Sequence, residues 1–489
     1  MNDWTIMVYM AGDNNLSDDM ITQLNGIDMG IRHTMEHGSP KPATPTKISV
    51  LAEYDGEHPL AATRRIDFTY NGPGHKPIEH AYKLTLAEDN RPVSEKIAEF
   101  IKYSVRLHPA DHYALVISGH ADGFQGRTLL LDENPPGVET VRQVATSIRK
   151  AIDDTAISGG KLDVIGFDAC VMNSLEVVYE FKHLAKVWIG SEGSTPNYSW
   201  DYFGIASEIY GRDISTLTGA DLGKIVVEKT LNYHSDYAFQ GRSVDIAAID
   251  LTKIDTLVAD MESSIDDLQG LFTLGIKEPA DLTNLLTDVH WRAQSFMQDQ
   301  NVDICDYFEL LGGSLKRSSM YARNQQEINA IERACQTIAN SAAGAVIVQG
   351  VTGGDYQFAR GLSIYMPWTY LGLAMSMANY RKLRFVGTTQ IGGVWFVLIL
   401  IQTLLISRGD IATVAAIYGI LSESFPVGLA PMKTDSKTLD ISFEKVLEPL
   451  ISKLSDAVGG VRDNPPRTKG DILREYFGRI RNYLPHLKP

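Results

Sequence analysis

The chain has 489 residues, of which 44% are hydrophobic and 21% charged, the composition of an ordinary globular protein. Its formal net charge of −15 argues against general nucleic-acid binding, which needs a basic surface. The three cysteines, Cys170, Cys305 and Cys335, are too few for a disulfide framework, and their odd number leaves a free thiol. The N-terminus lacks the basic start of a signal peptide, so we expect a cytoplasmic protein.

The first 200 or so residues alternate between expected strands and expected helices. Apolar, β-rich runs predict the strands, and segments with helical apolar spacing predict the helices. This alternation indicates an α/β fold with a mostly parallel sheet flanked by helices. The expected strands are 4–10, 48–52, 63–70, 113–118, 162–167 and 187–190, and the expected helices are 16–31, 92–107 and 138–154. We expect residues 127–132 to extend or pair with the strand 113–118.

Long helical stretches dominate from about residue 204 onward. We therefore predict three units: a catalytic core over 1–205, a helix-rich extension over 206–400, and a tail of unknown role over 401–489. The extension is expected to complete the sheet or pack on it, with strand candidates at 243–249, 343–349 and 361–366.

The most hydrophobic stretch is 391–406, IGGVWFVLILIQTLLI. It is shorter than the ~20 residues of a typical spanning helix, so we interpret it as a buried helix. A membrane anchor is the weaker alternative, and the sequence otherwise predicts no membrane association.

Two residues with complementary chemistry each follow a buried strand. Cys170 follows VIGFDA and His120 follows ALVISG, and the helix 138–154 lies between the two strands. This is the order of a βαβ unit, which places both residues at the carboxyl edge of the sheet, where α/β folds carry their sites. A thiol needs a neighbouring base to become a nucleophile, and His120 could supply it. The alternative for each residue alone is a buried apolar cysteine or a polar loop histidine.

Asp168 precedes Cys170 by two residues, so both side chains would face one side if the strand geometry persists. A carboxylate there would attract a cationic substrate side chain. The alternative is that Asp168 caps the following helix. No phosphate-binding loop, dinucleotide fingerprint, paired Cys/His metal spacing or G-x-S-x-G elbow occurs.

FDACVMNSLEVVYEF, with ISGHADGF upstream, resembles the clostripain-like cysteine peptidases of the caspase, gingipain and legumain clan. The resemblance extends to WTIMVYMAGDNNLSDDM, IGSEGSTPNYSWDY, SVDIAAIDL, VDICDYFELL and GLSIYMPW, in the family's order. It implies a caspase-like α/β fold and hydrolysis of peptide bonds after Arg or Lys in protein or peptide substrates.

The resemblance also implies roles for individual residues. Cys170 would be the nucleophile and His120 the general acid and base. Asp168 would select Arg or Lys, with Asp201 as a second candidate for that pocket. The backbone N–H groups of Cys170 and Ala121 would form the oxyanion hole. Most members have glycine where this chain has Ala121, which leaves the activity level open.

Further implications concern activation and cofactors. Family members are often zymogens cut between the His and Cys strands, and we expect a cut near the Pro135-Pro136 loop, at Arg142 first. Some relatives require calcium; the chain has no EF-hand loop, and no cofactor is required by its sequence. The rival functions are an inactive peptidase-like scaffold and a thiol amidase. The sequence does not define an oligomeric state.

Overall fold

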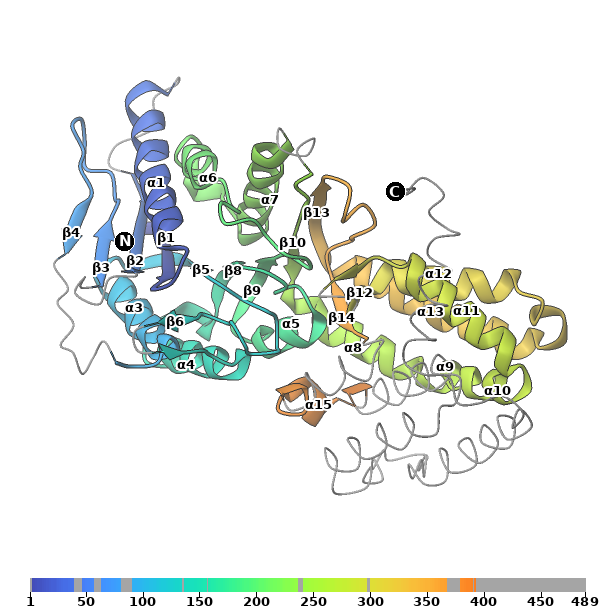
Figure 1. Ribbon diagram of the computed structural model, residues 1–489. Coiled ribbons are helices and arrows are strands. Elements are labelled where there is room, and N and C mark those ends of the chain that lie inside the picture. Colours follow the sequence, from blue (N-terminus) through green and yellow to red (C-terminus); the bar gives the residue numbers. More distant parts are fainter. Residues whose placement is uncertain are drawn as a thin grey trace.

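The fold is built on a mixed sheet of nine described strands, seen in the computed structural model of the chain (Figure 1). The structure describes residues 2–38, 46–56, 63–80, 90–133, 136–155, 157–235, 241–296, 300–366, 379–389 and 391–392. The strands are β1 (Asn2–Gly12), β2 (Ile48–Gly56), β3 (Arg64–Asp67), β4 (Ile78–His80), β5 (Ala110–Ser118), β8 (Leu162–Asp168), β9 (Ala185–Gly190), β10 (Val244–Asp250) and β13 (Val346–Thr352). Their order is β13-β10-β9-β8-β5-β1-β2-β3-β4.

The middle of the sheet is parallel and its two edges are antiparallel. Strands β9, β8, β5, β1 and β2 run parallel, and β10, β13, β3 and β4 add antiparallel edges. The carboxyl ends of the parallel strands therefore open on one edge, as the βαβ pattern predicts. Two smaller sheets consist of β6 (Asp132–Glu133) with β7 (Pro136–Gly137), and of β11 (Ser295–Phe296), β12 (Asn301–Asp303) and β14 (Ser363–Tyr365).

Helices cover both faces of the sheet (Figure 1). Side chains along β1 point alternately to the two faces of the sheet, so this strand contributes to the apolar core on both sides. Trp4 and Ile6 belong to one buried cluster, and Met7 and Tyr9 belong to the other. One face carries α1 (Ser17–His37), α6 (Tyr202–Tyr210) and α7 (Gly219–Ser235); the other carries α3 (Val93–Leu107), α4 (Val141–Asp153) and α5 (Leu175–Phe181).

The second half of the chain adds a helical region beside the sheet edge (Figure 1). Its apolar side chains continue one of the two sheet clusters, for example from Phe167 of β8 to Phe308 of α12. The division of the chain at residue 205 stays a prediction, and the tail 401–489 lies outside the described residues. The helices are α8 (Ile254–Ser263), α9 (Ile265–Leu268), α10 (Gly270–Lys277), α11 (Pro279–Arg292), α12 (Ile304–Arg317), α13 (Gln325–Ala345) and α15 (Arg384–Thr388).

Two local expectations differ from the structure. Residues 127–132 do not extend β5. After His120 the chain forms a loop, and β6 begins at Asp132. The helix expected from 138 begins at Val141, because Thr140 and Gln143 form a reciprocal cap. Almost all of the apolar run 391–406 lies outside the described residues. Within the described part of the chain, no helix has the length and apolarity needed to cross a membrane.

Candidate active site

The carboxyl ends of β5 and β8 bring His120 and Cys170 to one edge of the sheet. The two strands are parallel neighbours, and the last residues they pair are Ser118 and Asp168. His120 and Cys170 each follow two residues beyond this pair, on strands about 4.8 Å apart. The predicted placement of both residues at one carboxyl edge is therefore confirmed, and the structure adds that the two strands are neighbours.

The Cys170 thiol is half-buried and is held by Thr195. The Thr195 N–H donates to Sγ at 3.3 Å, and the Thr195 hydroxyl and carbonyl oxygens lie 3.6 and 3.7 Å from Sγ. Among the described residues, Thr195 rather than His120 is thus the hydrogen-bond partner of the thiol. Cys305 and Cys335 differ, because both are buried and burial raises the pKa of each thiol far above its ordinary value.

The residue after the nucleophile candidate has an unusual backbone conformation. Val171 has φ +59°, a left-handed value that costs a β-branched residue roughly 1–3 kcal/mol. Its N–H donates to the Gly193 carbonyl at 2.9 Å. Gly123, in the loop after His120, also has positive φ, and a Cβ there would lie 3.0 Å from the Val171 carbonyl oxygen. The two loops therefore touch backbone to backbone.

Asn173 fastens the Cys170 turn to its surroundings from a fully buried position. Its side-chain amide donates to the carbonyls of Gly190, at 2.9 Å, and Gly361, at 3.1 Å. Its Oδ1 accepts from the Trp188 indole at 2.7 Å. Because a buried amide is costly unless it is bonded, this arrangement fixes one conformation of the turn.

The His120 ring is half-buried and bonds to Asn15, in the turn between β1 and α1. Nε2 lies 2.7 Å from the Asn15 amide oxygen, and an oxygen only accepts, so this assignment puts the ring proton on Nε2. Nδ1 is then left as the base. Burial lowers the pKa of His120 below its ordinary value, while the carboxylate of Glu133 acts in the opposite direction. The resting imidazole is therefore neutral at neutral pH.

Ala121 adopts an ordinary backbone conformation. Leu130 and Val171 are the non-glycine residues with positive φ in the described part of the chain, and Ala121 is not one of them. No hydrogen bond runs from the N–H of Ala121 or Cys170 to another described residue. Alanine in place of the usual glycine therefore does not force this loop out of shape, and both amides remain available to an oxyanion.

Asp168 is buried and is bonded by neutral donors. The Ser118 hydroxyl donates to it at 3.1 Å and the Tyr202 hydroxyl at 3.0 Å. Burial raises the pKa of Asp168 to about 6, and the hydroxyl donors only partly offset this. Among the described residues, no Lys or Arg forms an ion pair with it. The alternative role of helix cap does not apply, since Ser174 caps α5.

Asp201 caps α6 by accepting the Gly204 N–H at 2.8 Å. Burial raises the pKa of Asp201 above its ordinary value. Its connection to Asp168 runs through the next residue, Tyr202, whose hydroxyl bonds the Asp168 carboxylate. The structure thus gives Asp201 a structural task, and its part in a substrate pocket stays a prediction.

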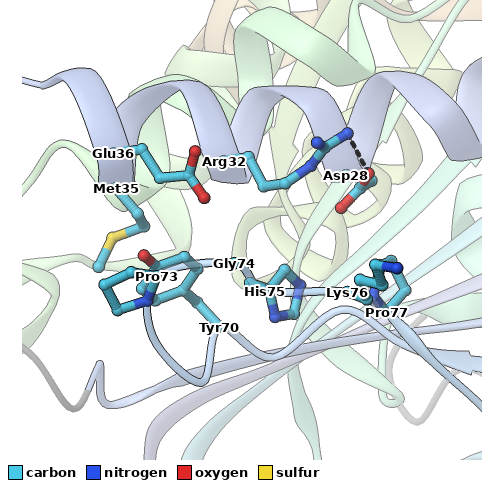
Figure 2. A pocket seen from close by; sticks show the side chains of 10 residues that line it. All are labelled: Asp28, Arg32, Met35, Glu36, Tyr70, Pro73, Gly74, His75, Lys76 and Pro77. Atoms are coloured by element: carbon cyan, nitrogen blue, oxygen red, sulfur yellow. Dashed lines mark ion pairs between the residues drawn. The ribbon is translucent and has the colours of Figure 1, made fainter.

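A separate hollow of about 670 Å³ lies between α1 and the segment that joins β3 to β4 (Figure 2). Arg32 pairs there with Asp28 at 2.6 Å, above His75 (Figure 2). Neither His120 nor Cys170 lines this hollow, so we place it outside the candidate site. Among the described residues, no group of three or more His, Cys, Asp or Glu side chains is arranged to hold a metal ion.

Sequence reasoning missed the residues that hold the dyad candidates. Asn15 was one polar residue in a turn, and Thr195 one residue in a polar loop, so neither carried a periodic signal. Asn173 offered a clue, because an amide within the apolar run VMNSLE needs buried partners. Asn14 helps to form the same turn as Asn15, with its Oδ1 accepting the Leu16 N–H at 2.9 Å.

Known proteins resemble this chain in sequence and in fold. The clostripain family profile matches residues 8–391. Clostripain from Hathewaya histolytica is 23% identical over 197 residues, which cover 36% of this chain and 36% of that protein. The alignment thus spans about a third of the curated relative.

Solved structures with the same fold include two C11 proteases. An inactive zymogen C11 protease from Parabacteroides distasonis is 20% identical, with a TM-score of 0.53 over 79% of this chain and 98% of that one. The secreted C11 cysteine protease "iotapain" from Bacteroides thetaiotaomicron is 16% identical, with a TM-score of 0.50 over 74% and 93%. At these identities the structures show the fold, while the profile covers most of the chain; the protein belongs to the clostripain family.

Proposed function

We propose that this protein is a cysteine endopeptidase that cuts peptide bonds after Arg or Lys. The observation that carries the proposal is the pairing of β5 with β8, because the chain leads from these neighbouring strand ends to a histidine and a half-buried cysteine, and Asp168 is the last residue of β8. Membership of the clostripain family supports the reaction class.

In the proposed reaction, His120 and Cys170 act as a dyad. Nδ1 of His120 takes the Sγ proton, since Nε2 is engaged by Asn15. The thiolate attacks the scissile carbonyl carbon, and the developing oxyanion receives the N–H groups of Cys170 and Ala121. His120 then gives its proton to the leaving amine. Water, activated by the same imidazole, hydrolyses the acyl-enzyme and restores the thiol.

Asp168 is the proposed specificity group for the basic side chain. The buried Asp168 carboxylate accepts hydrogen bonds from neutral hydroxyls, which do not compensate its negative charge. A substrate guanidinium or ammonium would compensate that charge with a charge-assisted hydrogen bond. The raised pKa of about 6 still leaves the carboxylate mainly ionised at neutral pH.

Fluorogenic peptides test the proposal directly. Peptides with Arg or Lys before the scissile bond should be hydrolysed by the native protein and not by Cys170→Ala. Matched peptides with Gln or norleucine at that position serve as controls. Absence of turnover together with an unreactive Cys170 would instead support the scaffold, and turnover of simple amides without peptides would support a thiol amidase.

We further propose that the chain is processed by self-cleavage between β5 and β8. Arg142, the first choice from sequence, lies in the first turn of α4, where cleavage needs local unfolding. Arg127 is exposed in the loop after His120, where its N–H bonds the Asp122 carboxylate at 2.9 Å. We therefore favour a cut after Arg127.

Mass spectrometry of incubated protein tests the cleavage site. Native protein should produce fragments that end at Arg127, and Cys170→Ala should stay intact. Arg127→Ala should block the cut, while Arg142→Ala, the matched control, should be processed normally. Unchanged processing in Arg127→Ala would contradict this site.

A further inference from the structure

The Cys170 sulfur is in contact with one polar residue that no role has yet explained. The Thr195 N–H lies 3.3 Å and its hydroxyl 3.6 Å from Sγ, and the hydroxyl can serve as donor or acceptor. The Thr195 carbonyl lies 3.7 Å away and accepts from the thiol. One residue thus presents an acceptor to the protonated sulfur and two donors to the ionised one.

The position of Thr195 is fixed by hydrogen bonds to its loop, two of them buried. The Asp245 carboxylate, on β10, accepts the N–H of Glu192 at 2.6 Å and of Gly193 at 2.9 Å. The Tyr356 hydroxyl accepts the Ser194 N–H at 3.1 Å. Each backbone amide that leads to Thr195 therefore has a defined partner, and this pre-organises the donors that face the sulfur.

Gly193, two residues before Thr195, has no room for a side chain. A Cβ on Gly193 would lie 2.5 Å from the Tyr356 ring and 2.8 Å from the Asp245 carboxylate. The Gly193 carbonyl in turn accepts the Val171 N–H at 2.9 Å. The loop that carries Thr195 and the turn that carries Cys170 are therefore held together on both sides of the sulfur.

The state of His120 leaves a task for such donors. Burial lowers the pKa of His120, so the resting ring is neutral and offers little charge to stabilise a thiolate. The Nε2–H of the ring donates to the Asn15 amide oxygen, so it does not donate to the Cys170 sulfur. The lowered pKa also disfavours the imidazolium that forms when Nδ1 takes the Sγ proton, so additional donors to the sulfur would favour this transfer.

We propose that Thr195 is a further catalytic residue, which stabilises the Cys170 thiolate with its backbone N–H and its hydroxyl. When the sulfur gives its proton to Nδ1 of His120, the negative charge on Sγ accepts both Thr195 donors. No bond to Thr195 forms or breaks, and no other reactant is needed. The catalytic part of this role rests on the proposed peptidase function, whereas the stabilisation of the thiolate does not.

Alkylation of Cys170 by iodoacetamide tests thiolate stabilisation without any substrate. The rate is measured at about pH 6 and about pH 9.5 by peptide mass spectrometry, which separates Cys170 from the buried cysteines. Thr195→Val keeps the shape and the N–H but removes the hydroxyl, and Thr195→Ser keeps the hydroxyl. Ser194→Ala, at an exposed neighbour, is the matched control.

We expect Thr195→Val to lower the ratio of the low-pH to the high-pH rate by about tenfold, the effect of one hydrogen bond to a charged group. Thr195→Ser and Ser194→Ala should stay within about twofold of the native ratio. An unchanged or higher ratio in Thr195→Val would overturn the proposal, as would an equal loss in Thr195→Ser. Thr195→Ala replaces Thr195→Val should the latter not fold.

Peptide hydrolysis separates this inference from the peptidase proposal. If the proposed function holds, Thr195→Val should lose kcat/KM in step with its low-pH alkylation rate. A lowered alkylation ratio in a protein that hydrolyses no peptide would support the role of Thr195 and contradict the peptidase. Peptide turnover with an unchanged alkylation ratio in Thr195→Val would support the peptidase and contradict the role of Thr195.

Discussion

The two loops that meet at the carboxyl edge of the sheet are built in different ways. The Cys170 turn is bonded to several neighbouring elements, through Val171, Asn173 and Thr195, and much of this network is buried. The His120 ring is half-buried and is held by a bond to Asn15, which is exposed. A non-glycine residue with positive φ occurs on each side, at Val171 beside Cys170 and at Leu130, whose N–H bonds the His120 carbonyl at 2.9 Å.

This difference indicates how the site divides its tasks. A nucleophile must be placed within a fraction of an ångström, and buried bonds supply that precision. A base that moves one proton to a sulfur and then to a leaving amine needs some freedom. We therefore expect the loss of a buried group on the cysteine side to affect the rate more than the loss of the Asn15 contact to the His120 ring.

The largest expected effect on the cysteine side comes from Asp168→Asn. Asparagine keeps the size of the side chain and still accepts from Ser118 and Tyr202, but it removes the charge. Loss of one partner of a buried charge pair costs about 2–5 kcal/mol, so kcat/KM for Arg and Lys peptides should fall by about a hundredfold or more.

Stability provides the control for Asp168→Asn. The pKa of Asp168 is raised to about 6 by burial, so native stability falls as pH rises from its ordinary pKa through about 6. Asp168→Asn has no carboxyl group to ionise, so it does not lose this stability. At pH 8 its melting temperature should equal or exceed that of the native protein. Retained preference for Arg and Lys peptides would show that another residue recognises the basic side chain.

On the histidine side, Asn15→Ala should have an intermediate effect. It removes the acceptor that fixes the Nε2–H tautomer of His120, which is worth about 1 kcal/mol. We expect kcat to fall about fivefold to tenfold with little change in KM, and the pH–rate profile to shift. Asn15→Asp should restore the acceptor and much of the rate. Equal losses in kcat for both variants would contradict the orienting role.

The smallest expected effect comes from Glu192→Gln, in the loop that leads to Thr195. Glu192 is fully buried beside Asp303 and Asp245, and it accepts the Gly361 N–H at 2.6 Å. Burial and then the neighbouring carboxylates raise the pKa of Glu192 well above its ordinary value. The uncharged acid is therefore the form that fits the folded protein.

The sign of this pH effect follows from the raised pKa. The stability contribution of Glu192 is complete below its ordinary pKa and is lost as pH rises toward the folded value. Glutamine imitates the protonated acid, so the variant should show a flatter dependence of Tm on pH and melt roughly 2–4 °C higher at pH 8. A steeper dependence in Glu192→Gln would contradict a protonated Glu192.

Much of the fold and the central pair of residues could be predicted from the sequence. Buried strands have a clear apolar pattern, and the βαβ order constrains the strands before His120 and Cys170 to be parallel. The strand expected over 162–167 agrees with β8 to within one residue, since the observed strand ends at Asp168. These features depend on local pattern and on general rules of topology.

The contacts around the two catalytic candidates could not be predicted, for physical reasons. Asn15 and Thr195 lie in irregular segments, where one dihedral angle decides where a side chain points. The burial of Glu192 contradicts the usual exposure of charged residues, and only the packing around it shows the burial and the neighbouring carboxylates that raise its pKa. Arg142 lies in the first turn of α4 and within the helix expected over 138–154, so a cleavage site there was at odds with the helix pattern itself.

One measurement tests the central claim most directly: hydrolysis of Arg- and Lys-terminated fluorogenic peptides by native protein, Cys170→Ala and His120→Ala. The account predicts turnover by the native protein that is lost in both variants, with all three proteins folded to the same melting temperature. Turnover that survives in Cys170→Ala would contradict it, because no other thiol in the described part of the chain lies at the edge of the sheet with a histidine beside it.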